Sequence, residues 1–502
     1  MSKVQVWKLP PLPEPIQKKQ KGSVADIPVQ ISLPEDLFSK SPVSKEGSSD
    51  PTGGKKQSET ASDQREDGAL YLKGTLLDLK KPLFEEAGKI ITDSTGKIGH
   101  IALPFEAGNG LTALQLKDDI RNFLTNLEPD TKFSFVVEQS DQKALESFLN
   151  EVNPVNRDRI RIIPVDKYIS IWFRDSMLPA YSEEGKPKIM IQDRTYWPSP
   201  NDPLVPKAIA EANPDIPAVP MPLLRVDGGN ILSNSRTTFI GVDSADQTTD
   251  LLQKLAKQGN AFKEKVIAFY ENRTNQKVVE TEIPGQGEVS IEDMWRTLAP
   301  EVFKSEFKRE VHIIGTDDPL TPEYEQQPVF HMDMAFTPIG DDTVLVADPS
   351  MAISIVGALS PERYKEANRE LSETSGASGD ILKKLIRNSS DPALQRNCDS
   401  VARDMEKQGY KVFRLPYLAS GYDHLPFITY NNCILEDFSR EDGSKVKRVF
   451  LPTYGVRELD SASEAVYESL GFDVKPVTMA GITTLKGAIR CSCNIIDKTV
   501  TA

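Results

Sequence analysis

The residues best suited to do chemistry in this sequence are its cysteines, and there are only four of them among 502 residues. So few cysteines do not make a disulfide framework. Cys491 and Cys493 stand two apart in the segment LKGAIRCSCNIID. A tetrahedral zinc site usually has a second ligand pair at typical spacing, which is not present, and a redox pair is more often Cys-x-x-Cys. A single cysteine in a turn that begins with glycine fits nucleophilic catalysis better, and Cys491 is the candidate.

A histidine and an aspartate stand two residues apart in the apolar segment PVFHMDMAF, at His331 and Asp333. On a β-strand, residues i and i+2 point to the same face. We expect a strand here, with both polar side chains on one face and the intervening methionines in the core. Burying a histidine and a carboxylate together is costly unless they have partners or a function. His100 and His312 lie in ordinary strand patterns, and we expect them to be structural.

Two further stretches place polar residues beside strand-like segments. An Asp-Gly-Gly sequence normally forms a turn, and paired glycines let a backbone come close to a ligand or to a neighbouring strand. A tryptophan beside an Arg-Asp pair is more often a core residue flanked by a surface ion pair. Neither stretch is diagnostic alone. The candidate residues are Trp172, Arg174 and Asp175 in WFRDSMLP, and Asp227, Gly228 and Asn230 in RVDGGNIL.

Taken in order, the four stretches resemble the guanidine-modifying (pentein) superfamily, and within it the agmatine and peptidylarginine deiminases most. The pattern of that superfamily is Trp-x-Arg-Asp or Trp-x-x-Asp, then Asp/Glu-Gly-Gly, then His-x-Asp, then a cysteine near the C-terminus. The resemblance covers roughly residues 95–495, and the segment 428–455 resembles the family's Asn-containing strand. Deiminases of these types carry Gly-x-x-His-Cys at the nucleophile, where this chain has GAIRC with Arg490 in place of the histidine. Cys491, and not Cys493, therefore aligns with the nucleophile.

The resemblance implies a hydrolase that converts a guanidino group to a ureido group plus ammonia, without a metal or cofactor. A guanidinium presents a planar fork of N–H donors, which two carboxylates can each grip in bidentate fashion. By resemblance these two grips are Asp175 and Asp333. Cys491 would form a thiouronium intermediate, with His331 as general acid and then base and Asp227 orienting His331. The other motif residues are expected to bind the substrate: Trp172, Arg174, Gly228, Asn230 and Arg490.

Several alternatives remain open. The substrate could be peptidyl-arginine, arginine or agmatine, and the tail and insertions favour a protein or an unusual substrate. An amidinotransferase would use a similar Cys-His-Asp set and differ only in the acceptor. A catalytically silent binding protein of the same fold would be expected to lack a catalytic residue, and none is missing. A papain-like hydrolase has its cysteine before its histidine in the chain, which is the opposite of the order here.

Composition restricts the partners. The chain has 60 Lys and Arg against 74 Asp and Glu, a net charge of −14. This balance argues against nucleic acid and suits a cationic substrate such as a free guanidine or arginine side chains of a protein, although net charge by itself favours plain solubility as the explanation. There is no apolar stretch of membrane-spanning length and no apolar signal core near the start. We expect a protein that is cytoplasmic, or exported without a Sec signal, and not membrane-bound.

The pattern along the chain predicts one large α/β domain after a leader. Residues 1–68 are rich in Pro, Ser, Lys, Gly and Gln, which predicts a disordered tail. Strand-like and helical segments then alternate over residues 69–502, with insertions expected near 195–220, 255–308 and 352–412. The resemblance further implies a pentein-type propeller of ββαβ modules around a central active site. We expect strands at 98–105, 132–138, 159–165, 188–192, 309–315, 342–347, 427–435 and 448–454, and helices at 111–127, 141–152, 245–258, 290–306, 361–373, 394–409 and 461–471.

Overall fold

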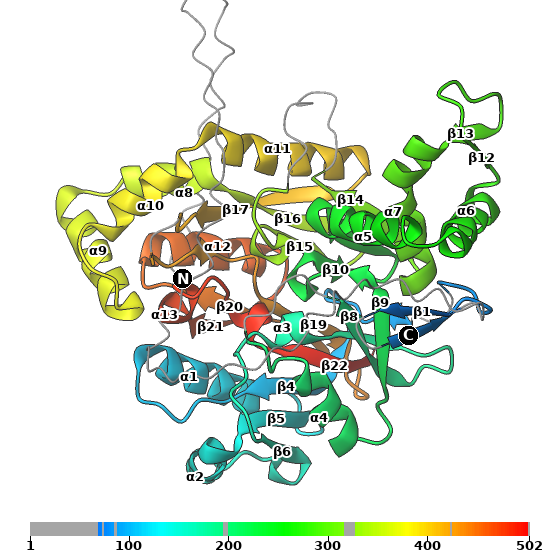
Figure 1. Ribbon diagram of the computed structural model, residues 1–502. Helices are drawn as coiled ribbons and strands as arrows, with labels where there is room; N and C mark the ends of the chain where they lie inside the picture. The colour runs from blue at the N-terminus through cyan, green and yellow to red at the C-terminus, as the bar shows by residue number, and fades with distance from the viewer. Residues whose placement is uncertain are drawn as a thin grey trace, which may run out of the picture. The chain divides into compact units, whose positions relative to one another are not determined.

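The computed structural model describes residues 69–72, 75–84, 88–193, 199–315, 327–421 and 424–499, which lie in one compact unit, Asp63–Ala502. The tail predicted at residues 1–68 lies outside the described residues. Strands and helices alternate through the unit (Figure 1), so the predicted α/β class is confirmed.

Five sheets share one arrangement. In each, two antiparallel strands are followed by a strand that runs parallel to the second of them. Parallel neighbours cannot be joined by a hairpin turn, so helices supply the crossovers. The first sheet contains, in order, β22 (Asn494–Thr499), β4 (Lys97–Pro104), β5 (Lys132–Glu138) and β6 (Ile160–Val165), with crossovers α1 (Leu111–Asn126) and α2 (Gln142–Val152).

The other four sheets follow in chain order and differ mainly in their crossovers. The second sheet has β3 (Lys89–Ile90), β7 (Leu178–Tyr181), β8 (Pro187–Asp193) and β9 (Ala218–Arg225), with α4 (Leu204–Ala212). The third has β10 (Ile231–Ser233), β11 (Thr237–Gly241) and β14 (Glu310–Ile314). The fourth has β15 (Phe336–Ile339), β16 (Thr343–Asp348), β17 (Lys411–Leu418) and β18 (Ile428–Thr429). The fifth has β19 (Ile434–Ser439), β20 (Lys445–Thr453) and β21 (Asp473–Thr478), with α12 (Arg457–Ser469).

The three segments expected as insertions have different places in this scheme. The described part of 195–220 contains α4 and the start of β9, the strand that pairs with β8 in the second sheet. The segment 255–308 follows α5 (Val242–Ala256) and adds α6 (Asn260–Thr274), β12 (Lys277–Val279), β13 (Glu288–Ser290) and α7 (Ile291–Phe307). The segment 352–412 holds most of a four-helix crossover, α8 (Pro349–Gly357), α9 (Pro361–Ser375), α10 (Ile381–Ser389) and α11 (Pro392–Lys407).

Two predicted strands are wrong, and both errors fall where polar side chains interrupt an otherwise apolar segment. The strand predicted at 427–435 is split into β18 and β19 by the irregular stretch 430–433. The stretch around His331 and Asp333 is not a strand, because Met332–Met334 forms a 3-10 turn and β15 begins only at Phe336. In that turn the N–H of Met334 donates to the carbonyl oxygen of His331 at 3.1 Å, so the backbone bonds locally and not to a neighbouring strand.

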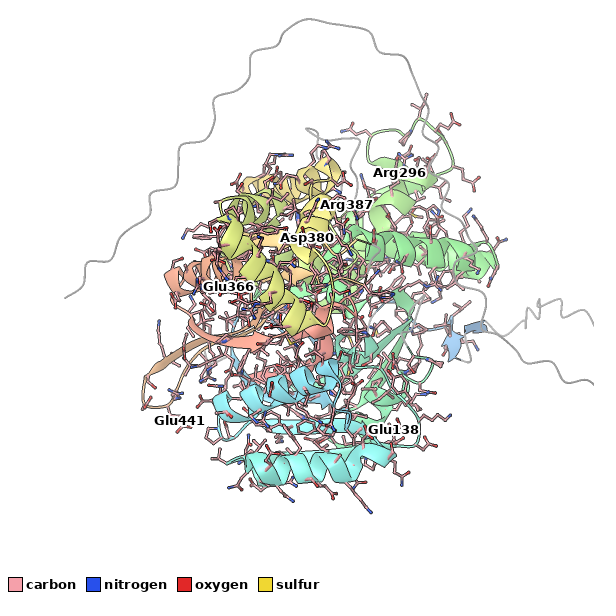
Figure 2. All side chains as sticks on the ribbon, turned by 90° about the vertical axis from the view of Figure 1, so that its left-hand side faces the viewer. Glu138, Arg296, Glu366, Asp380, Arg387 and Glu441 are labelled. Atoms are coloured by element: carbon pink, nitrogen blue, oxygen red, sulfur yellow. The ribbon has the colours of Figure 1, made fainter. Side chains whose placement is uncertain are left out.

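Charged side chains of both signs are spread over the surface of this unit. Figure 2 labels examples on separate elements, among them Arg296 on α7, Glu366 on α9 and Glu441 between β19 and β20. Among the described residues, no helix combines the length and the apolar character that crossing a membrane would require.

Helix α1 ties the first sheet to the fifth. Phe123 on α1 and Phe450 on β20 are both fully buried, and their ring centroids lie 4.7 Å apart. Gln115, about two turns earlier on the same helix, accepts hydrogen bonds from the N–H groups of Gly481 and Ile482 at 2.8 and 3.2 Å. The segment that precedes Cys491 is therefore anchored on α1.

Removing the aromatic contact should destabilise the whole unit. We expect Phe123→Ala to lower the free energy of unfolding by about 3–5 kcal/mol, because it leaves a cavity between α1 and β20. Urea unfolding measures this. Leu114→Ala is the control on the same helix: Leu114 is 47% exposed, and its loss should change the free energy of unfolding by only about 0.5 kcal/mol. Equal effects of the two changes would contradict this account of the core.

Candidate active site

The candidate residues lie in the segments that lead into the antiparallel strand pairs of the five sheets. Trp172 and α3 (Phe173–Ser176) precede β7, and the turn Gly228–Asn230 precedes β10. His331 and Asp333 precede β15, and α14 (Ile489–Ser492), which carries Cys491, precedes β22. The segment before β19 contributes Asn432, whose side chain touches Cys491. One short loop or turn from each of the five sheets therefore contributes a residue to the candidate site.

The thiol of Cys491 is buried among polar groups. Its residue is 3% exposed, and its Sγ lies 3.8 Å from Oδ2 of Asp333 and 3.1 Å from Nδ2 of Asn432. Burial raises the pKa of the Cys491 thiol and Asp333 raises it further, while His331 lowers it. Burial and Asp333 therefore oppose the ionisation of this thiol, whereas His331 favours it.

His331 is placed between two carboxylates. Its Nε2 lies 3.6 Å from Oδ2 of Asp227, and its Nδ1 lies 4.0 Å from Oδ2 of Asp175. Burial acts to lower the pKa of His331, but Asp175 and Asp227 outweigh it and hold that pKa well above its ordinary value. These carboxylates therefore favour the protonated imidazole, which is the form that can act as a general acid.

Glycines permit the close approaches that this arrangement needs. A Cβ at position 229 would lie 2.5 Å from Nδ1 of His331, and one at Gly228 would lie 1.9 Å from the carbonyl oxygen of Arg174. A Cβ at Gly487 would lie 2.2 Å from the ring of Trp172. These separations are shorter than any real Cβ contact, so the Asp-Gly-Gly turn fits against the histidine only because it lacks side chains.

Asp333 and Arg490 form a buried ion pair beside the thiol. Asp333 is fully buried, and its Oδ2 accepts a hydrogen bond from Nη1 of Arg490 at 2.7 Å. The other end of the guanidinium donates to Oδ1 of Asp93, from Nε at 3.1 Å and from Nη2 at 3.0 Å. Oδ1 of Asp333 is buried and has no hydrogen-bond partner among the described residues. Burial raises the pKa of Asp333, and Arg490 opposes that rise.

Arg174 and Asn230, which we expected to contact substrate, are engaged with protein groups. Arg174 donates from Nε to the carbonyl oxygen of Gly228 at 3.0 Å and from Nη2 to that of Ile231 at 2.9 Å. Oδ1 of Asn230 accepts the N–H of Met332 at 2.9 Å and thereby fixes the turn that follows His331. Both side chains hold the loops that carry the reactive residues. Trp172 is partly buried and packs against the apolar cluster that includes Cys491.

Two residues of this site were missed in the sequence. Asp93 follows β3, and burial acts to raise its pKa, but Arg490 and Arg174 outweigh burial and lower it. Nothing in the surrounding sequence, ITDSTGK, distinguishes this aspartate from a turn residue. Asn432 stands in the segment 428–455 noted for its asparagines, but no role follows from the sequence because the contact with Cys491 depends on the break between β18 and β19.

The same cluster has the donor atoms of a metal site. His331, Asp333 and Cys491 offer ligand atoms that all lie within 4.8 Å of one another. A metal would require a neutral imidazole and a thiolate, whereas the carboxylates around His331 favour its protonated form and one oxygen of Asp333 is bound to Arg490. The donor set fits acid–base chemistry better than metal binding, and the expected lack of a metal stays a prediction.

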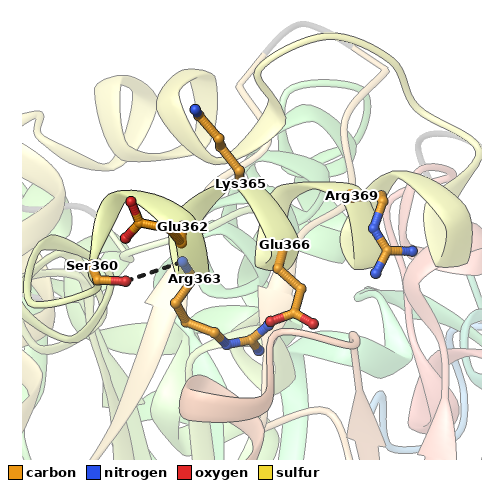
Figure 3. A pocket seen from close by; sticks show the side chains of 6 residues that line it. All are labelled: Ser360, Glu362, Arg363, Lys365, Glu366 and Arg369. Carbon is orange, nitrogen blue, oxygen red and sulfur yellow. Dashed lines mark hydrogen bonds and ion pairs between the residues drawn. The ribbon is translucent and has the colours of Figure 1, made fainter.

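A separate surface hollow of about 640 Å³ lies over α9 and involves none of these residues. Figure 3 shows its lining of Ser360, Glu362, Arg363, Lys365, Glu366 and Arg369. Arg363 is bound to Glu366 at 3.0 Å and to Glu458 at 2.7 Å, so its charge is already neutralised by protein carboxylates.

No protein-family model and no curated protein matches the sequence, but solved structures resemble the chain. Agmatine deiminase from C. jejuni is 12% identical with a TM-score of 0.48, over 86% of this chain and 99% of its own. Agmatine deiminase of Enterococcus faecalis is 12% identical with a TM-score of 0.46, over 83% and 96%. DDAH from Pseudomonas aeruginosa is 10% identical with a TM-score of 0.35, over 79% and 98%. These neighbours are members of the guanidine-modifying superfamily, which the sequence motifs resemble.

Removing the charge of Asp227 should lower the pKa of His331. Asp227→Asn keeps the shape of the side chain and removes one of the two carboxylates that stabilise the imidazolium. Titration of the imidazole C–H signals by NMR measures the change, and His331→Ala identifies the signal among the four histidines. Asp404→Asn is the matched control, because Asp404 pairs with His312 at 2.6 Å and its loss should leave the titration of His331 as it is. A His331 pKa that does not move in Asp227→Asn would contradict the pairing.

Proposed function

We propose that this protein hydrolyses a guanidino group to a ureido group and ammonia, with Cys491 as nucleophile. The observation that carries the proposal is Oδ1 of Asp333, a fully buried carboxylate oxygen without a hydrogen-bond partner among the described residues. Leaving such an oxygen unsatisfied is costly, which favours a ligand that brings an N–H donor. Oδ2 of the same carboxylate lies 3.8 Å from Sγ of Cys491, so that donor would lie beside the thiol.

The arrangement of charges supports a cationic ligand. Asp175 is 6% exposed and Asp333 is fully buried, and both lie close to His331 and Cys491. A guanidinium held by these two carboxylates has its central carbon fixed for attack. Its positive charge also favours the thiolate form of Cys491, against the burial that opposes ionisation.

The proposed reaction uses His331 twice. The thiolate of Cys491 forms a bond to the central carbon, and the imidazolium of His331 gives its proton to one nitrogen, which leaves as ammonia. A thiouronium remains on the sulfur. Water then adds to the same carbon and loses a proton to the neutral His331, the C–S bond breaks, and the ureido product and the thiolate are released. Asp227, 3.6 Å from His331, keeps the imidazole oriented through both steps.

Arg490 limits the number of carboxylate oxygens with which Asp333 can bind a substrate guanidinium. Two bidentate carboxylate grips were expected, but Oδ2 of Asp333 is already bound to Arg490 at 2.7 Å. Asp333 would therefore hold the substrate through Oδ1 alone, and Arg490 would act by fixing this carboxylate and not by touching the substrate. The proposal also takes the five sheets to be arranged as a pentein-type propeller. Arginine, agmatine and peptidyl-arginine all present the required group.

Replacing Cys491 should abolish turnover, whereas replacing Cys493 should not. We expect Cys491→Ala to lower kcat/KM by at least about 10³-fold, because the covalent route is lost. Cys493→Ala should keep most of the activity. The assay measures ammonia and ureido product from arginine, agmatine and arginine-containing peptides.

Three results of this assay would overturn the proposal or part of it. Full turnover by Cys491→Ala would rule out the nucleophile. Failure of the wild-type protein to release ammonia from any of these guanidines would rule out the deiminase. Transfer of the amidine to added ornithine or glycine without free ammonia would establish a transferase in its place.

A methyl group at Gly229 should displace His331. Gly229→Ala puts a Cβ 2.5 Å from Nδ1 of the imidazole, and we expect kcat to fall by about 10²-fold, since such a shift disturbs the reacting geometry. Gly259→Ala is the matched control, because a Cβ there meets nothing within 4 Å. Steady-state kinetics with the best guanidine substrate measure both, and an unchanged kcat in Gly229→Ala would contradict the role of His331.

A further inference from the structure

The segment between β18 and β19 brings an asparagine side chain to the proposed nucleophile. Asn432 is fully buried, and its amide makes three hydrogen bonds to α14. Its Oδ1 accepts the backbone N–H groups of Arg490 at 2.9 Å and of Cys491 at 3.2 Å. Its Nδ2 donates to Sγ of Cys491 at 3.1 Å. Through one planar group, Asn432 touches both the backbone and the sulfur of the proposed nucleophile.

The two backbone N–H groups fix which way the amide faces. Both are donors, so they require an acceptor, and only the oxygen of the amide can serve them. The NH₂ group of Asn432 must then face Sγ of Cys491. A flipped amide would set its NH₂ group against two N–H donors and leave two buried donors unsatisfied.

A donor aimed at sulfur favours the thiolate over the thiol. Hydrogen bonding to the charged form of an acid stabilises that form, and Asn432 supplies such a bond without adding a charge. This matters because burial and Asp333 both oppose ionisation of Cys491. We infer that Asn432 is a further catalytic residue, whose amide N–H holds the Cys491 thiolate while its carbonyl oxygen locks α14 in place.

The neighbouring asparagine shows what a purely structural role looks like. Asn431 donates from Nδ2 to Oγ1 of Thr337 and to the carbonyl oxygen of Leu345, each at 3.1 Å. These contacts tie the segment before the fifth sheet to the strands of the fourth. Within the described part of the chain, by contrast, the side-chain hydrogen bonds of Asn432 go to Arg490 and Cys491.

Other titratable groups also act on the thiol and must be separated from Asn432. They come from several elements: Asp175 on α3, His331 and Asp333 before β15, Tyr454 after β20, and Cys493 after α14. Arg490 influences the Cys491 thiol through its hydrogen bond to Asp333. A substitution confined to Asn432 leaves all of these groups in place.

The test is the pH dependence of thiol alkylation in Asn432→Asp. The aspartate keeps an oxygen to accept the two backbone N–H groups, but it sets a second oxygen against Sγ in place of the donor. We expect the midpoint of Cys491 alkylation by iodoacetamide to move to higher pH, and the rate at pH 7 to fall about tenfold or more. Alkylation of Cys491→Ala gives the background from the other three cysteines. Because no substrate is involved, the measurement does not depend on the proposed reaction.

Asn368→Asp is the matched control. Asn368 on α9 has a similar pattern, since its Oδ1 accepts the N–H of Leu382 at 3.0 Å and its Nδ2 donates to the carbonyl oxygen of Gly379 at 2.9 Å. Neither of these two bonds goes to a sulfur, so the substitution should leave the alkylation midpoint of Cys491 unchanged. If Asn432→Asp does not fold, as judged by circular dichroism, Asn432→Ser takes its place. The serine loses the donor to Sγ without adding a charge, and the same upward shift is expected.

The catalytic part of this inference rests on the proposed function, and the two fail in different ways. An unchanged alkylation midpoint in a folded Asn432 variant overturns the role of Asn432, whatever the wild-type protein turns over. A shifted midpoint supports the hold on the thiolate, even if the wild-type protein releases no ammonia from any guanidine, in which case only the proposed function falls. Where turnover is found, kcat of Asn432→Asp should fall at pH 7 and recover partly at higher pH.

Discussion

The site depends on one buried cation, the guanidinium of Arg490. It bridges Asp333, in the segment before the fourth sheet, and Asp93, after the short strand β3. It also donates to the carbonyl oxygen of Ile231, at the start of the third sheet, at 2.7 Å. Removing one partner of such a buried network leaves an uncompensated charge, which typically costs about 3–5 kcal/mol. Loops from separate sheets therefore keep their relative positions because they share this charge.

The same cation decides what chemistry the carboxylate beside the thiol can do. With Oδ2 of Asp333 bound to Arg490, the carboxylate is held in one orientation and offers a single open oxygen. Asp175 and Asp227 raise the pKa of His331, and burial raises the pKa of the Cys491 thiol. In the proposed reaction, a guanidinium that binds beside Cys491 favours the thiolate form of this cysteine. The same cation donates a hydrogen bond to Oδ1 of Asp333. Under the proposed function, the resting site is thus less reactive than the occupied one, which protects a buried thiol from unrelated electrophiles.

The sequence was sufficient for most of the regular elements, and it named candidate side chains that lie together in the structure, but it did not reveal the network that holds them. Strands such as β5 and helices such as α1 follow from apolar periodicity, and the predicted ends agree within one residue. The segments around His331 and Asn432 were misread as strands because their apolar residues, such as Met332 and Met334, suit a strand and a buried turn equally well. Asp93 could not be found at all, since its importance comes from Arg490, about 400 positions away in the chain.

The pairing of β22 with β4 has a consequence for how the protein folds. These strands are neighbours in the first sheet, yet nearly 400 residues separate Ala102 from its partner Asn494. During synthesis on the ribosome, β4 emerges early and waits with one edge unpaired until the whole intervening chain has been made. Such long-range pairing slows folding, and an open apolar edge in the meantime invites contact with other chains. Cys491, three residues before β22, is synthesised after the other loops of the site, so those loops leave the ribosome before the proposed nucleophile does.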